Sequence, residues 1–146
     1  MAAFNKFNTF SHYLMGGVSG QVISFGSDTF KVLLTNTAPV ATNSKYSDIS
    51  ATELANGNGY LSGGSASAAS TANSSGTETV TAADVTFTAT GSMGPFRYSV
   101  FYDVTPTDKP LICWFDYGSS ITLNNGETFT VEPNSATPNG TLFTLA

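Results

Sequence analysis

The stretches that decide the fold are Phe96-Arg97-Tyr98-Ser99-Val100-Phe101-Tyr102-Asp103 and Leu111-Ile112-Cys113-Trp114-Phe115-Asp116-Tyr117. Successive side chains of a β-strand point to opposite faces. In both stretches the two alternating sets of side chains are largely apolar, so both faces need cover. We therefore predict two central strands that lie between layers of the same chain or against a partner.

Shorter strand signals surround these two stretches at spacings of about 8–12 residues. The dipeptide Asn125-Gly126 predicts a tight hairpin that joins residues 121–123 to residues 128–131. About eight short strands predict an all-β fold, which we assign to a jelly-roll-like β-sandwich. The remaining strands are expected at residues 22–25, 30–34, 79–81, 85–89 and 141–145.

Two segments between the predicted strands are irregular. Residues 36–64 are too long for a simple connection, and Ser50 to Leu54 suggests one helical turn with Ser50 as its cap and Glu53 reaching back. Residues 65–76 are small, polar and uncharged, which predicts a polar edge strand followed by its turn.

The N-terminal segment carries apolar residues at spacings of three and four, which is typical of one face of a short helix. It is predicted to end at Gly16-Gly17. Residues 1–20 are thus a helix or arm in front of a single β-sandwich domain of residues 21–146. The segment either covers an open end of the core or docks on a neighbouring subunit. Its apolar residues are Phe4, Phe7, Phe10, Leu14 and Val18.

The composition of the 146 residues is poor in charge and rich in aromatic side chains. Charged residues make up 10% of the chain, aromatic residues make up 12%, and the net charge is −5. Such a surface suits a protein inside a large assembly, or equally a stable secreted domain. The five Lys and Arg residues are scattered, which argues against nucleic acid as a partner. No apolar run is long enough to span a membrane, and the N-terminus does not have the pattern of a signal peptide.

The residue types that catalysis and metal binding require are sparse. His12 is the only histidine, and we expect it to be a solvated helix residue. Cys113 is the only cysteine, and we expect it to be buried as a small apolar side chain. Acids such as Asp103 and Asp116 flank predicted strands, where turn chemistry explains them better than the paired acids of a glycosidase. We predict no enzymatic activity, no metal and no cofactor.

The aromatic residues of the two central strands allow three interpretations. Trp114 and Tyr117 could form a platform on which sugars stack, or these rings could belong to a shared core. A third possibility is that one face is core and the other meets a partner subunit. The number of rings exceeds what a lone sandwich is expected to hide.

Several segments together resemble a family of small virion proteins of tailed bacteriophages, and the similarity covers nearly the whole chain. The segments are residues 3–8, 27–40, 57–60, 63–64, 94–98, 116–120 and 126–131. The resemblance implies a head decoration (cement) protein, without catalytic residues to carry over. Its location would be the capsid surface of the virion after synthesis in the host cytoplasm.

A cement protein needs a large and mostly neutral contact surface. We therefore expect the major capsid protein and a second or third copy of the chain, in a homodimer or homotrimer, as partners. A tail or baseplate component is the first alternative, and a carbohydrate-binding module is the second. Deleting residues 2–15 is expected to abolish attachment and leave a folded β-domain. The predicted interface residues are Phe4, Phe7, Phe10, Tyr13, Tyr98, Tyr102, Trp114 and Tyr117.

Overall fold

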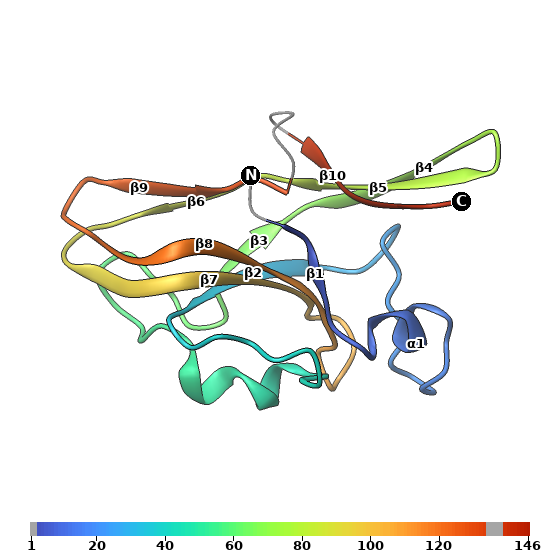
Figure 1. Ribbon diagram of the computed structural model, residues 1–146, viewed down its shortest axis with the longest axis horizontal. Helices are drawn as coiled ribbons and strands as arrows, with labels where there is room; N and C mark the ends of the chain where they lie inside the picture. The colour runs from blue at the N-terminus through green and yellow to red at the C-terminus, as the bar shows by residue number, and fades with distance from the viewer. Residues whose placement is uncertain (1–2, 134–138) are drawn as a thin grey trace.

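A computed structural model describes residues 3–133 and 139–146, which form ten strands in three antiparallel sheets (Figure 1). The largest sheet has five strands, and the two long apolar stretches form its centre, as predicted. Its strands, in spatial order, are β1 (Asn5–Lys6), β8 (Leu111–Leu123), β7 (Met93–Asp103), β2 (Phe30–Thr35) and β3 (Ser65–Ser67).

The second layer of the sandwich consists of the two smaller sheets. One has the order β10 (Asn139–Leu145), β5 (Thr77–Ala83) and β4 (Ala69–Ser74), and the other pairs β6 (Val85–Thr88) with β9 (Thr128–Val131). In Figure 1 these strands run above β8, β7 and β2. The predicted all-β sandwich is confirmed, whereas its assignment to the jelly-roll type stays a prediction.

One extended segment passes from the first layer to the second. β3 pairs with β2 in the large sheet, and β4 begins only one residue later, after Ala68, and pairs with β5. The crossing is held by the Ser67 hydroxyl, which donates to the carbonyl of Ala83 at 2.7 Å, and by the Ala83 N–H, which donates to the carbonyl of Ala68 at 2.8 Å. The polar stretch of residues 65–76 therefore forms two edge strands and a turn, where one edge strand and its turn were predicted.

Apolar side chains of both layers meet in the main core. Val32, Phe101 and Ile112 from the large sheet pack with Val80 and Phe87 from the second layer. Cys113 is fully buried in this core, as predicted, and burial raises the pKa of its thiol.

The opposite face of the large sheet has a smaller core of its own. Leu33, Val100 and Leu111 are fully buried there, together with Ile49 from the long loop of residues 36–64. Two 3₁₀ turns, Tyr46–Asp48 and Ser50–Thr52, belong to this loop. The loop forms a third layer, so the chain hides more rings than the two-layer estimate from the sequence allowed.

The N-terminal segment was expected to be a helix or an arm, and only part of it is helical. Asn5 and Lys6 pair with Trp114 and Cys113 as strand β1, and the helix α1 (Phe10–Leu14) is a little more than one turn long. Pairing with the edge of β8 gives the backbone N–H and C=O groups of Asn5 and Lys6 hydrogen-bond partners. This pairing stabilises a strand at Asn5 and Lys6 more than the spacing of the apolar residues stabilises a helix. His12 lies exposed on α1, as predicted.

Residues 22–25 were predicted as a strand, but they form none. Ile23 and Phe25 are buried in alternation as expected, yet the backbone binds locally. The Asp28 carboxylate accepts from the Ser24 N–H at 2.8 Å, and the Asp28 N–H donates to the Ser24 carbonyl at 2.9 Å. A local turn thus takes the groups that a neighbouring strand would have used.

The predicted hairpin around Asn125-Gly126 is wrong. β8 extends to Leu123 and pairs there with Met93, whereas β9 pairs with β6 in the other layer. A type I′ hairpin turn requires positive φ at both central residues, and here only Gly126 has it, at 87°. Its N–H donates to the carbonyl of Ala89 at 2.7 Å. The turn therefore connects the two layers instead of two paired strands.

Candidate functional site

Four of the eight aromatic residues that were predicted to contact a partner are buried within the protein. Phe10 and Tyr13 pack in the main core, and Phe7 and Tyr102 pack in the smaller core. Their exposed fractions are 0% for Phe7, 3% for Phe10, 7% for Tyr13 and 2% for Tyr102. The prediction that these four rings face a neighbouring subunit is corrected, because packing into the two cores of the same chain already buries them.

The other four predicted residues keep part of their surface. Phe4 is partly buried and packs edge-on against Phe115. Tyr98 and Trp114 are also partly buried, whereas Tyr117 is 57% exposed. Any contact through the predicted set must therefore use these residues.

Tyr98 and Trp114 share the outer face of the large sheet with an ion pair. Tyr98 lies opposite Asp116 in the β7–β8 ladder, and the next pair on the same face is Val100 with Trp114. The Arg97 guanidinium donates two hydrogen bonds to Asp116, at 2.7 and 2.9 Å, and lies over the Tyr98 ring at 5.3 Å. We call Arg97, Tyr98, Trp114 and Asp116 the outer strip.

The outer strip is electrically neutral. The Arg97 side chain holds the pKa of the Asp116 carboxyl below its usual range, so both groups of the pair are charged at neutral pH. Each side chain is 36% exposed. The strip thus offers two rings and a closed ion pair, a surface that can meet another protein without leaving an unpaired charge buried.

Trp114 and Tyr117 do not form a shared platform for sugars. Trp114 packs toward the smaller core, with its ring 4.6 Å from that of Phe7. Tyr117 packs edge-on against Phe129, 5.5 Å away, and Phe129 borders the main core. The two rings therefore lie on opposite faces of β8, which removes the geometric basis of the carbohydrate-binding alternative.

A carboxylate and three tyrosines fasten the long loop to the large sheet. Glu53 accepts hydrogen bonds from the hydroxyls of Tyr46 and Tyr60, both at 2.6 Å, and from the Gly63 N–H at 2.5 Å. Tyr60 also accepts from the Leu34 N–H of β2 at 3.1 Å. The third tyrosine, Tyr102 of β7, donates a hydrogen bond to the carbonyl of Gly63 at 2.8 Å.

Burial dominates the electrostatics of this cluster. Burial and the hydrogen bond to Glu53 raise the pKa of Tyr46 to about 12, and the same causes raise the pKa of Tyr60 further. Neither phenol is therefore poised to exchange a proton near neutral pH. The sequence indicated a helical turn with Glu53 reaching back to Ser50, but this turn lacks a side-chain cap and Glu53 binds the tyrosines instead.

Two acids that the sequence did not single out as a pair lie close together. Asp103, at the end of β7, is fully buried, and one of its oxygens accepts from the Thr105 N–H at 2.9 Å. Burial raises the pKa of Asp103 to about 7, and the neighbouring Asp28 contributes to the rise. The Asp28 carboxylate accepts hydrogen bonds from the Ser24 N–H and from the Ser27 hydroxyl. The local signal was an Asp at the end of a buried strand, which turn chemistry alone could explain.

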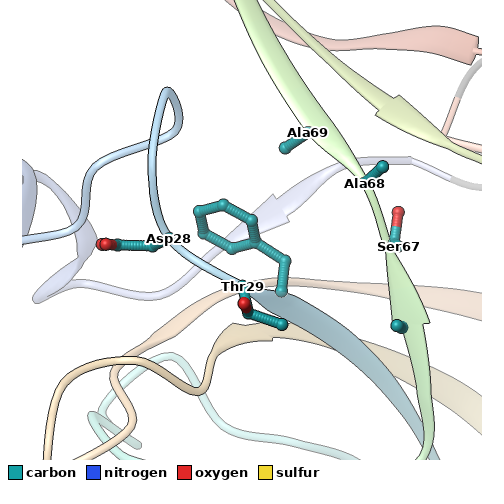
Figure 2. A pocket seen from close by; sticks show the side chains of 7 residues that line it. Asp28, Thr29, Ser67, Ala68 and Ala69 are labelled. Carbon is teal, nitrogen blue, oxygen red and sulfur yellow. The ribbon is translucent and has the colours of Figure 1, made fainter.

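A shallow hollow of about 330 Å³ adjoins Asp28. Figure 2 shows it between the loop that carries Asp28 and Thr29 and the crossing segment with Ser67, Ala68 and Ala69. Within residues 3–133 and 139–146, no three His, Cys, Asp or Glu side chains are grouped so as to hold a metal ion. In the same residues, no helix has the length and apolar character to cross a membrane.

Comparison of the chain with models of protein families, with curated proteins and with solved structures gave no match. The fold alone defines the class of the protein, an antiparallel all-β sandwich with its large sheet covered on both faces.

Proposed function

We propose that this protein is a structural component of a tailed-bacteriophage virion that binds the outside of the head and stabilises contacts between major capsid subunits. The whole-length resemblance noted in the sequence supports the virion role. Rigidity supports the clamp role, because a sheet covered on both faces transmits load without rearranging.

The outer strip is the observation that carries the proposal. It places Tyr98 and Trp114 on the five-stranded sheet, beside an Arg97–Asp116 ion pair that is already formed. Aromatic residues and Arg are enriched at protein interfaces, and the central ones contribute most of the binding energy. The proposed contact with the major capsid protein uses this strip, which narrows the interface predicted from the sequence to Tyr98 and Trp114.

The test measures cosedimentation of the purified protein with mature heads that lack it. Tyr98→Ala should weaken binding at least about tenfold, the loss typical of a central aromatic contact. Tyr117→Ala is the matched control, because Tyr117 is an exposed tyrosine on the other face of β8. Both variants should unfold at similar denaturant concentrations, so that a loss of binding is not a loss of fold.

Purified tails and baseplates form the second arm of the experiment. Binding to tails in place of heads would assign the protein to the tail, which is the first alternative. Equal binding of Tyr98→Ala and the wild type to heads would exclude the outer strip as the contact. Binding to neither particle would contradict the virion proposal itself.

A further inference from the structure

The strand β4 (Ala69–Ser74) forms an edge of the second layer without the usual protection. One side of β4 pairs with β5 in continuous register, and in the part of the chain that the structure describes no strand pairs with its other side. Its residues from Ser70 to Ser74 are all exposed. The strand contains no Lys, Arg, Asp, Glu or Pro, the residues that commonly block pairing at exposed edges.

The other edges among the described strands each carry such a device. β1 has two residues, one of them Lys6, and β3 has three. The free part of β8 carries Asp116, and its ladder with β7 has several register shifts. β6 and β9 have four residues each, with Glu127 and Glu132 flanking β9, and β10 contains a register shift. β4, with six residues, is the exception.

The turn after β4 fixes which backbone groups point outward. Ser75 and Gly76 both have positive φ, at 51° and 83°, as a two-residue type I′ turn requires. Ser74 and Thr77 flank this turn, so Ser74 and every second residue before it bind β5. The N–H and C=O groups of Ala69, Thr71 and Asn73 therefore point away from β5 and are free to accept another strand.

We propose that β4 pairs antiparallel with β4 of a second copy of this chain, with Thr71 on the two-fold axis. The outward-pointing N–H and C=O groups of one copy can bind only the outward-pointing groups of the other copy. Thr71 therefore pairs with Thr71 of the second copy, and Ala69 pairs with Asn73 of the second copy. Because β4 is uncharged, this symmetric pairing opposes no like charges, and a Thr–Thr cross-strand pair is favourable. The two second layers become one continuous sheet.

The hollow beside the crossing segment supports a second copy as the occupant. The proposed register places Ser74 of the second copy opposite Ala68, directly before its Ser75-Gly76 turn. Ala68 and Ala69 line the hollow of about 330 Å³. The small turn of one copy thus reaches the hollow of the other, at both ends of the symmetric pair. This dimer concerns the isolated protein and does not depend on binding to heads.

Disulfide trapping tests the pairing and its register. Thr71→Cys places two thiols across the axis at a Cα separation of about 5.5 Å, which a disulfide can span. Asn73→Cys is a register control, because its two copies lie four residues apart along the strands, about 13 Å. Thr144→Cys is an edge control, since Thr144 is an exposed threonine of β10 at the opposite edge of the same sheet. The native Cys113 is fully buried and does not interfere.

Thr71→Cys should form covalent dimers at least about tenfold faster than both control variants, because pairing raises the local thiol concentration. The molar mass of the wild type, from light scattering, should rise with concentration toward that of a dimer. Thr71→Lys should abolish this rise and Thr144→Lys should preserve it. Equal rates for the three cysteine variants would overturn the proposal, as would faster trapping of Asn73→Cys. A wild type that stays monomeric with unselective trapping would mean that another occupant, or none, covers β4.

Discussion

The Tyr60 hydroxyl donates a hydrogen bond of 2.6 Å to Glu53, and this contact joins the third layer to the sheet beneath it. Tyr60 is 1% exposed and also accepts the Leu34 N–H of β2. One phenol thus satisfies a buried backbone group and a carboxylate of the covering loop together.

Tyr60→Phe should lower the free energy of unfolding by about 1–3 kcal/mol, because the Leu34 N–H is left buried without an acceptor. Urea unfolding followed by fluorescence measures the loss. Tyr117→Phe is the control, since Tyr117 is exposed and its change should stay within about 0.5 kcal/mol. Equal effects of the two substitutions would show that the cluster does not fasten the loop.

Asp103 should make the protein less stable as the pH rises from about 4 to about 7. Burial raises the pKa of Asp103 to about 7 in the folded chain, so the folded state retains a proton that the unfolded state has released. Deprotonation then requires a buried charge next to Asp28. Thermal unfolding at about pH 5 and about pH 8 measures the decline, which linkage limits to a few kcal/mol.

Asp103→Asn is the matched variant for this pH dependence. An amide oxygen can still accept from the Thr105 N–H, but the side chain cannot titrate. The decline in melting temperature from low to neutral pH should therefore shrink in the variant. An unchanged pH profile would assign the decline to other groups.

Truncation of residues 2–15 should unfold the domain or leave it severely destabilised, contrary to the expectation from the sequence. The deletion removes β1 and opens the main core where Phe10 and Tyr13 pack. Phe10→Ala alone should cost about 3–5 kcal/mol, as measured by denaturant unfolding. Met15→Ala, at a residue 82% exposed, should be nearly neutral. A stable truncated domain would show that the N-terminal segment is dispensable for folding.

Gly64→Ala should cost about 3 kcal/mol or more, because the added methyl group would overlap the carbonyl oxygen of Val32 in β2. Gly76→Ala isolates the cost of backbone strain. Both glycines have positive φ, at 73° and 83°, but a methyl group at Gly76 meets open space, so about 1–2 kcal/mol is expected there. Similar losses in thermal unfolding for the two variants would contradict the close approach of Gly64 to β2.

The sequence predicted the parts of the fold that depend on local pattern. Residues 30–34, 96–103 and 111–117 were recognised as strands because their apolar side chains recur at the spacing of a strand, and they form β2 and the matching parts of β7 and β8. The hairpin at Asn125-Gly126 was misassigned, because the pairing of β9 with β6 depends on residues 40 positions away or more.

For the same reason, the local sequence pattern could not predict the third layer or the outer strip. The local pattern around Glu53 indicated only a helix cap, and the hydrogen bond between Tyr60 and Glu53 forms only when the loop folds back on β2. The rings of Tyr98, Tyr102, Trp114 and Tyr117 were correctly assigned to strands. Which of these rings stay accessible depends on how the loop covers the sheet. Tyr102 became buried and Tyr98 did not, although both lie on the same face of β7.

The passage of the chain through Ala68 has a mechanical consequence. Because β3 and β4 are one stretch of backbone, a force that shears one sheet along the other loads covalent bonds and two ladders of hydrogen bonds at the same time. Sliding of the layers would have to unzip β3 from β2 or β4 from β5. The two layers are therefore joined by the covalent backbone as well as by the packing of apolar side chains between them.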